Sequence, residues 1–466
     1  MTGYVSRATL PGATDRTDAD DASVTEGGCV DIGRVLDDGP FTLLQKFVVV
    51  LAALSIVVDG FDGQLIGFAI PLLIKEWQIT RNAFAPVVAA GLCGMGIGSA
   101  CAGLFADRLG RRWAVIGSVL VFGIATCAIS LAPNVMAIAV LRFVAGLGIG
   151  GALPSSTTLT AEYTPARRRT FAVTATIVCV PLGGFVAGLF AHAILPQYGW
   201  RGLFVAGGVP PLLLAVALLF ALPESPRFLV RHQRRWSELV ALLGRMSRHV
   251  APDATFVDLR EQAAEKHSGV TALFKDGRAL DTSLIWCAFF VCLLAVYSAF
   301  SWLPSMLSAE GLSLSVAGYG LTMYNLGGVA GALVCAAAIA RGGSRWPLVV
   351  CCAGGAVSAW VLIGVDIVHH VGLLIAGLAV HGLFVNAVQS TMYALCAHVY
   401  PTRIRATGTA AALVFGRLGA IISAFAGAAV IVAGGAASFL AMLGAAMAVV
   451  LIALAFVRRH IPALKL

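Results

Sequence analysis

Two carboxylates lie within a segment that is otherwise built mainly from apolar residues and glycine, 57-VVDGFDGQLIGFAIP-71. Asp59 and Asp62 are three positions apart, so a helix places them on one face, and the two glycines that follow them weaken the helix locally. Two carboxylates this close in a low-dielectric environment resist joint ionisation. One of them could then take up and release a proton, which is the chemistry of proton coupling. The alternative is structural, with one aspartate neutralising an arginine and the other capping a broken helix.

Two arginines also interrupt long apolar runs. Arg142 lies in 142-RFVAGLGIGGALP-154 and Arg417 in 414-VFGRLGAIISAF-425. A guanidinium inside a membrane span is expensive, so it is expected to face a cavity, a carboxylate or an anionic substrate. Because arginine can bind a carboxylate through two parallel hydrogen bonds, the pair suits a ligand that carries a carboxylate. Pairing with an aspartate of the first segment is the competing explanation for one arginine.

The second half of the chain supplies polar and aromatic residues for a binding pocket. Rings could stack on a flat ligand while amides orient its substituents. The candidates are Tyr297, Trp302, Tyr324, Asn325, His381, Asn386, Gln389 and Tyr393. Each one alone is explained as well by packing or by hydrogen bonds between helices, and an isolated histidine is more often a satisfied core residue than a proton carrier. The set, rather than any one member, indicates a site.

Membrane-spanning helices are the elements that must position these residues. Hydrophobic residues make up 59% of the 466 residues and charged residues 12%, and run after run is apolar all round, which disfavours a soluble protein. Runs of spanning length lie at 47–74, 83–106, 112–131, 134–161, 170–195, 202–222, 283–307, 315–339, 346–366, 371–398, 407–432 and 436–457. The sequence therefore predicts an all-α integral membrane protein with twelve transmembrane helices.

Polar segments flank and divide these runs. Residues 1–40 are rich in acidic side chains and are expected to form a disordered cytoplasmic tail. The polar stretch at 223–282, with an amphipathic helical patch at 237–246, separates a six-helix bundle at 41–222 from a second one at 283–460.

The two halves also repeat each other. The tract 107-DRLGRRW-113 recurs as 340-ARGGSRW-346, and 162-EYTPARRRT-170 recurs in 398-HVYPTRIRA-406. Both tracts align at nearly the same offset, which indicates a duplicated six-helix unit and hence two pseudo-symmetric bundles.

Charge fixes the expected orientation. An even number of spans puts both termini on one side, and the short loops of that side are rich in arginine, whereas the opposite loops hold only Lys75, Arg81 and Arg201. The positive-inside rule therefore places the termini in the cytoplasm, and it explains the basic character of the chain without a nucleic-acid partner. The eleven cysteines form no CxxC or Cys/His cluster of zinc spacing, and no phosphate-binding loop occurs, so neither a metal nor a cofactor is expected.

The tract 103-GLFADRLGRR-112 fits GxxxDRxGRR between two spans. We expect Gly103 to permit close helix packing, Gly110 to permit a tight turn, and Asp107 to pair with arginines or a helix N-terminus. A loop that only sets topology would explain the arginines but not Asp107 or the glycine spacing. The candidate gating residues of this loop and of the tract at 162–170 with its repeat at 398–406 are Gly103, Asp107, Arg108, Gly110, Arg111, Arg112, Glu162, Arg169, Arg403 and Arg405.

Taken together, these motifs resemble the aromatic acid:proton symporters of the major facilitator superfamily. The resemblance rests on the DGFD tract of the first span, GxxxDRxGRR, the Arg142 span, PESPRFL at 223–229, SWLPSML at 301–307, YPTRIRATG at 400–408 and the GRLG around Arg417. It implies proton coupling by Asp59 and Asp62, substrate handling by Arg142 and Arg417, and gating by Asp107 with Arg111 and Arg112. The sequence departs from the family at Ala340, where many members repeat the loop aspartate, and at Ser423 and Ala424, where a Gly-Pro pair is common.

The expected function is import of a benzoate-like or phenylpropanoid acid together with protons, by alternating access and driven by the proton gradient. We expect a monomer in the lipid bilayer of a bacterial inner membrane, with small aromatic acids and protons as its partners. The alternatives are a symporter of another organic acid (shikimate-like, dicarboxylate or nicotinate) and a sensor with a transporter-like body. A membrane-embedded enzyme is disfavoured because no nucleophile or metal triad accompanies the buried acids.

Overall fold

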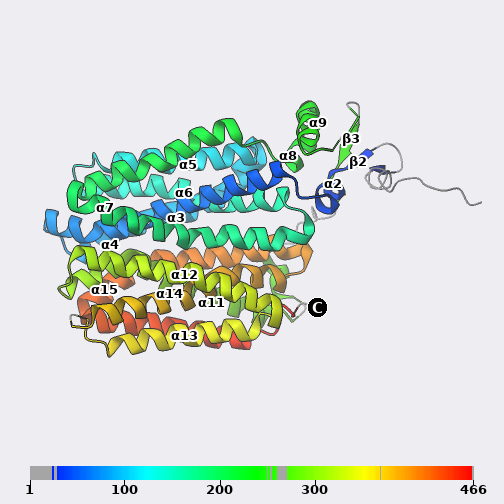
Figure 1. The fold of residues 1–466 in the computed structure, drawn as a ribbon. Coiled ribbons are helices and arrows are strands. Elements are labelled where there is room, and N and C mark those ends of the chain that lie inside the picture. The colour runs from blue at the N-terminus through cyan, green and yellow to red at the C-terminus, as the bar shows by residue number, and fades with distance from the viewer. Residues whose placement is uncertain are drawn as a thin grey trace, which may run out of the picture.

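The computed structural model describes residues 24–25, 29–248, 250–251, 254–259, 270–275, 277–367 and 369–463. Its long helices lie side by side in two groups, one above the other in Figure 1. The first group consists of α3 (Leu43–Trp77), α4 (Arg81–Leu109), α5 (Arg111–Ile129), α6 (Val135–Tyr163) and α7 (Ala166–Ala221). The second consists of α11 (Ala279–Ala309), α12 (Leu314–Gly342), α13 (Arg345–Ile363), α14 (Val371–Val399) and α15 (Thr402–Phe456).

Ten of the described helices are long and apolar enough to cross a membrane, and two of them must cross it twice. A straight helix with the 56 residues of α7 would measure about 84 Å at 1.5 Å per residue, far more than the ~30 Å hydrocarbon core. Both long helices contain non-helical backbone, at Gly199 in α7 and at Gly434 and Gly435 in α15. Gly199 and Gly435 have a φ of 62°, which glycine adopts readily. Each group therefore has six spans, and the predicted twelve-helix, two-bundle fold is confirmed.

Side-chain caps explain where several of these helices begin. Thr42 precedes α3 and forms a capping box with Gln45, in which each side chain bonds to the other residue's backbone N–H. Thr80, Asn134 and Ser313 each accept a hydrogen bond from a backbone N–H of the first turn of α4, α6 and α12.

Small residues let helices approach closely within a bundle. A Cβ added at Gly94 of α4 would lie 2.1 Å from the Phe143 carbonyl oxygen, and one added at Gly146 of α6 would lie 2.2 Å from the Gly91 oxygen. These two helices therefore pack backbone against backbone, which is how helices associate tightly in lipid.

Short elements gather at one end of the bundles, here called the α9 end (Figure 1). They are β1 (Val24–Thr25), β2 (Cys29–Asp31), α2 (Ile32–Asp38), α8 (Pro226–Val230), η1 (Gln233–Arg235), α9 (Trp236–Arg245), β3 (Thr255–Val257) and η2 (Val270–Phe274). The helix expected at 237–246 is confirmed as α9, which buries Leu239, Leu242 and Leu243. The other end of the bundles is called the opposite end below.

The prediction of a disordered tail over residues 1–40 is wrong for residues 29–38. Strand β2 pairs parallel with β3 and antiparallel with β1. Asp31 caps the start of α2, since its side chain accepts a hydrogen bond from the Gly33 N–H at 3.0 Å. Ile32 and Leu36 are fully buried. Composition misled because it counts acidic side chains without their partners, and Asp37, read as solvated, is buried against Arg169 and Arg227.

Candidate functional site

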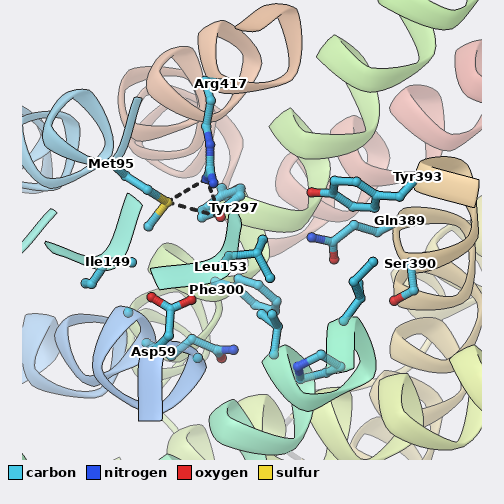
Figure 2. Close-up of a pocket in the computed structure, with 16 residues that line it drawn as sticks. Asp59, Met95, Ile149, Leu153, Tyr297, Phe300, Gln389, Ser390, Tyr393 and Arg417 are labelled. Atoms are coloured by element: carbon cyan, nitrogen blue, oxygen red, sulfur yellow. Dashed lines mark hydrogen bonds between the residues drawn. The ribbon is translucent and has the colours of Figure 1, made fainter. Parts of the chain in front are cut away.

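A cavity lies between the two bundles, enclosed by α3, α4, α6, α7, α11, α14 and α15 (Figure 2). Its volume is about 40 Å³. Ligand pockets commonly measure about 300–1,000 Å³. In this conformation the cavity is therefore too narrow for an aromatic acid, and the lining side chains must move aside to admit a ligand.

Two charged residues, Asp59 of α3 and Arg417 of α15, line the cavity from different bundles. Arg417 Nη1 donates to the hydroxyl of Tyr297 at 2.9 Å and lies 2.6 Å from the sulfur of Met95. Its Nε and Nη2 form no hydrogen bond with the described residues, and neither atom is fully buried. Half of the guanidinium is thus anchored and half is open to a ligand.

Asp59 carries an unused acceptor. The residue is 6% exposed, and its Oδ1 is buried without a hydrogen-bond partner within the part of the chain that the structure describes. Figure 2 shows the carboxylate pointing into the cavity, across from the Arg417, Met95 and Tyr297 cluster.

The structure separates Asp62 and Arg142 from this cavity. Asp62 accepts a 2.5 Å hydrogen bond from Thr126 of α5, and Arg142 donates to the Gly63 carbonyl oxygen at 3.4 Å, so both lie in the interior of the first bundle. Nε and Nη1 of Arg142 and Oδ2 of Asp62 are buried without a hydrogen-bond partner among the described residues. Arg142 does not line the cavity itself, but its hydrogen-bond partner Gly63 does.

The predicted pocket residues of the second half divide into two sets. Tyr297, Gln389 and Tyr393 line the cavity. The others lie outside its lining and contact protein groups: Trp302 packs against Gly427, Tyr324 against Phe300 and His381, Asn325 pairs with Gln64, Asn386 donates to Gly382 O, and His381 Nδ1 lies 3.0 Å from Ser358 Oγ.

Sequence reasoning missed Met95, Gln64 and Ser390, which also line the cavity. Met95 gives no signal because an apolar residue is expected in a span. Gln64 could have been found, since it is an amide in the same apolar segment as the two aspartates.

Several contacts join the bundles at the cavity or towards the opposite end. Gln64 and Asn325 exchange two amide hydrogen bonds, of 3.1 and 2.7 Å. Nearer the end, Arg81 Nε donates to Ser305 Oγ at 3.1 Å, and His192 Nδ1 lies 3.0 Å from Ser315 Oγ. These bonds hold the bundles together on that side of the cavity.

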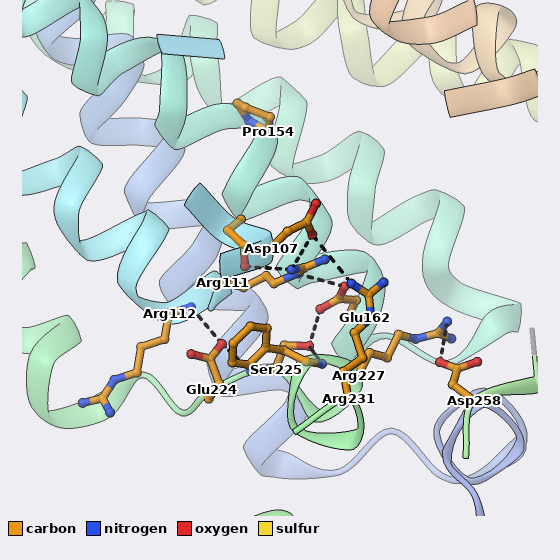
Figure 3. Close-up of polar contacts among 12 residues, drawn as sticks. Asp107, Arg111, Arg112, Pro154, Glu162, Glu224, Ser225, Arg227, Arg231 and Asp258 are labelled. Atoms are coloured by element: carbon orange, nitrogen blue, oxygen red, sulfur yellow. Dashed lines mark hydrogen bonds and ion pairs between the residues drawn. The ribbon is translucent and has the colours of Figure 1, made fainter. Parts of the chain in front are cut away.

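The GxxxDRxGRR loop forms a polar network at the α9 end (Figure 3). Arg111 pairs with Asp107 at 2.9 Å and with Glu162 at 3.4 Å, and Ser225 donates to Glu162. Glu224, next in the chain to Ser225, accepts from the Arg112 backbone N–H at 3.1 Å. The network links the α4–α5 loop, the end of α6 and the segment before α8, all within or beside the first bundle.

Gly110 makes the predicted tight turn, with a φ of 103°, and a Cβ there would lie 2.1 Å from Glu224 Oε2. The prediction that Gly103 permits close packing is wrong for this conformation, because nothing lies within 4 Å of a Cβ built there. The reason is that this stretch of α4 faces outward, with Leu104 and Phe105 exposed.

The remaining gating candidates lie outside this polar network. Arg108 is exposed, Arg169 donates to Ala161 O and pairs with Asp37, and Arg405 donates to Tyr400 O. The side chain of Arg403 lies outside the described residues.

Burial raises the pKa of Glu224, against the backbone N–H groups of Ser225 and Arg112, which lower it.

Comparison with known proteins supports a transporter. The model of the family described as "Major Facilitator Superfamily" matches residues 52–322 and 285–465. The 4-hydroxybenzoate transporter PcaK of Pseudomonas putida is 36% identical over 403 residues, covering 86% of this chain and 90% of the relative. The gallate transporter of Pseudomonas putida is 33% identical, with 86% and 89% covered. The inward-open xylose transporter XylE of E. coli has a TM-score of 0.69 at 17% identity, over 89% of this chain and 97% of that one, a likeness of fold alone.

Proposed function

The chain belongs to the Major Facilitator Superfamily, and from that premise we propose that it is a proton-coupled symporter that imports aromatic carboxylates by alternating access. The observation that carries the proposal is that one cavity is lined by both an unpartnered carboxylate oxygen and a half-open guanidinium. The relatives named as 4-hydroxybenzoate and gallate transporters support an aromatic acid as the substrate.

Arg417 is the proposed anchor for the substrate carboxylate. Tyr297 and Met95 hold Nη1, so Nε and Nη2 remain to form a two-pronged pair with a carboxylate. The ring would then lie between Tyr297 and Phe300 on one side and Ile149, Leu153 and other apolar residues of the first bundle on the other.

Charge balance gives Asp59 its role. In the empty cavity, the charges of the two charged lining residues sum to zero. A bound carboxylate leaves one net negative charge, and a proton on Asp59 restores neutrality. Since moving net charge through a low-dielectric interior is expensive, the loaded carrier would reorient readily only with that proton bound. The charges of the lining residues thus predict one proton for each monocarboxylate. Asp62 and Arg142 carry opposite charges and lie inside the first bundle. They would influence the charge of Asp59 without contacting the substrate.

Alternating access follows from where the bundles are joined. Contacts such as Arg81 with Ser305 close the opposite end, and the arginine-rich loops would place the α9 end in the cytoplasm of a bacterial cell. The conformation would thus be closed towards the outside. Rupture of these contacts would open it, while the Asp107, Arg111 and Glu162 network would keep the α9 end of the first bundle rigid as it rocks.

Uptake into proteoliposomes tests the proposal. Purified protein should accumulate labelled 4-hydroxybenzoate when the lumen is alkaline, and substrate addition should alkalinise the outside. Asp59→Asn should lose this accumulation but keep exchange of internal for external substrate, because its loaded cavity is neutral and its empty cavity is not. The exposed Asp38→Asn serves as the control.

Three results would overturn the proposal. Gradient-driven accumulation by Asp59→Asn at the wild-type level would remove the coupling role. Accumulation of a shikimate-like acid, a dicarboxylate or nicotinate in place of aromatic acids would replace the substrate. Binding without transport would indicate a sensor.

A further inference from the structure

Three neighbouring polar residues of α14, here called the α14 polar face, remain without a task. Gln389, Ser390 and Tyr393 all line the cavity. Figure 2 shows Tyr393, Gln389 and Ser390 along one side of the cavity, with the Tyr393 hydroxyl and the Gln389 side chain directed inward. The spacing i, i+1 and i+4 puts them on one side of the helix.

The α14 polar face differs from the other polar residues of its helix. Asn386 donates to the Gly382 oxygen at 3.1 Å, and Thr391 donates to the Ala387 oxygen at 2.6 Å. The side-chain polar atoms of Gln389, Ser390 and Tyr393 form no hydrogen bond within the described residues, although a helical serine commonly bonds to its own backbone. These groups are therefore available to a ligand.

Packing fixes the direction of at least one of these groups. The Tyr393 ring meets Phe289 edge to face, with ring centroids 5.5 Å apart and planes at 90°. Its hydroxyl is consequently held on the cavity side, and preorganised donors discriminate between ligands better than mobile ones.

The wall formed by α6 and α7 is apolar. These helices contribute Ile149, Leu153, Ile177, Val180 and Pro181 to the lining, whereas the polar lining of the first bundle comes from α3, where Gln64 is already paired with Asn325 and Asp59 is the proposed proton carrier. A ring whose carboxylate is bound by Arg417 would have an apolar side towards α6 and α7 and a polar side towards α14. Ring substituents that donate and accept hydrogen bonds would satisfy the polar side, whereas an unsubstituted ring would strip water from it without replacement.

We propose that the α14 polar face selects aromatic acids that carry ring hydroxyl groups, an inference that rests on the proposed transport function. Gln389 offers both a donor and an acceptor, and the two hydroxyls can each do either. Three such groups suit rings with one to three hydroxyls better than benzoate itself.

A pair of substrates that differ by one hydroxyl tests the inference. In proteoliposomes, the ratio of kcat/KM for 4-hydroxybenzoate to that for benzoate should be about 10 or more for the wild type, the effect of one or two hydrogen bonds. Gln389→Leu, Ser390→Ala and Tyr393→Phe should each be measured, and the largest effect should bring the ratio near one, mainly through KM. Tyr198→Phe, exposed and outside the cavity lining, is the matched control for the tyrosine change.

The ratio within one variant is independent of how much protein folds. For a variant too weak to transport, the ratio of the two dissociation constants in detergent replaces it. A wild-type ratio near one, or a ratio unchanged in all three variants, overturns the selectivity while leaving aromatic acid transport standing. Wild-type protein that accumulates neither acid overturns the proposed function and the selectivity together.

Discussion

Replacing Arg417 isolates the contribution of the substrate's charge. In the structure, Nη1 is already committed to Tyr297 and Met95, so a carboxylate would bind through Nε and Nη2. Hydrogen bonds to charged groups contribute about 1.5–3 kcal/mol each, so losing two raises the dissociation constant of an aromatic carboxylate about 10²- to 10⁴-fold. Arg417→Gln should show this full loss. Arg417→Lys keeps the charge without the two-pronged geometry and should lie in between.

The assay compares benzoate with benzamide, its neutral counterpart of nearly equal size. Wild-type protein in detergent should bind benzoate more tightly, and Arg417→Gln should abolish that preference while binding of the amide changes little. Tyr297→Phe should weaken the binding free energy of benzoate by about 0.5–1.5 kcal/mol, because it removes only the hydrogen bond that orients the guanidinium. If Arg417→Gln still prefers benzoate over benzamide by the wild-type margin, the carboxylate binds elsewhere and the proposed pose is refuted.

Three further predictions concern the α9 end. Gly110→Ala should lower the stability by about 1–3 kcal/mol, since φ is 103° and the added Cβ meets Glu224, whereas Gly117→Ala, with open space beside it, should not; thermal unfolding in detergent measures both. Asp37→Asn should destabilise the N-terminal segment by about 3 kcal/mol and speed its proteolysis, because it breaks a buried pair with arginines, while the exposed Asp38→Asn should match the wild type. The folded protein raises the pKa of Glu224, so the stability that this residue contributes is fully present below its ordinary pKa of 4.5 and is lost as the pH rises through its pKa in the folded state. The melting temperature of Glu224→Gln should therefore rise relative to that of the wild type across this pH range. An unchanged difference between pH 4 and pH 8 would contradict this sign.

Much of the fold was predictable because lipid imposes a length on every apolar run. The twelve segments and the division at the central polar stretch follow from that constraint alone. The N-terminal segment was not predictable in the same way. Its order depends on partners far along the chain, such as Arg227 for Asp37 and Phe256 for Val30, and composition carries no information on such pairs.

The candidate site was predictable in kind but only partly in membership. Depth in the membrane can be read from the position along a span, so Arg142 and Arg417 gave equal signals. Which side of the helix each faces is set by packing, and packing sends Arg142 into the first bundle and Arg417 into the cavity. Trp302 and Tyr324 were misplaced for the same reason, since an aromatic ring fills a core as readily as it lines a pocket.

The two aspartates of the first span show how sharp this limit is. Positions three apart on a helix differ by about 60° in direction, close enough to share a face by any pattern argument. The boundary between bundle and cavity runs between those two directions: Asp59 lines the cavity, and Asp62 bonds to Thr126 inside the bundle. The same one-turn step therefore separates a carboxylate that can meet substrate and water from one that cannot. On this geometry, the proposed change of charge on substrate binding falls to Asp59, whereas Asp62 would influence transport only through its neighbours.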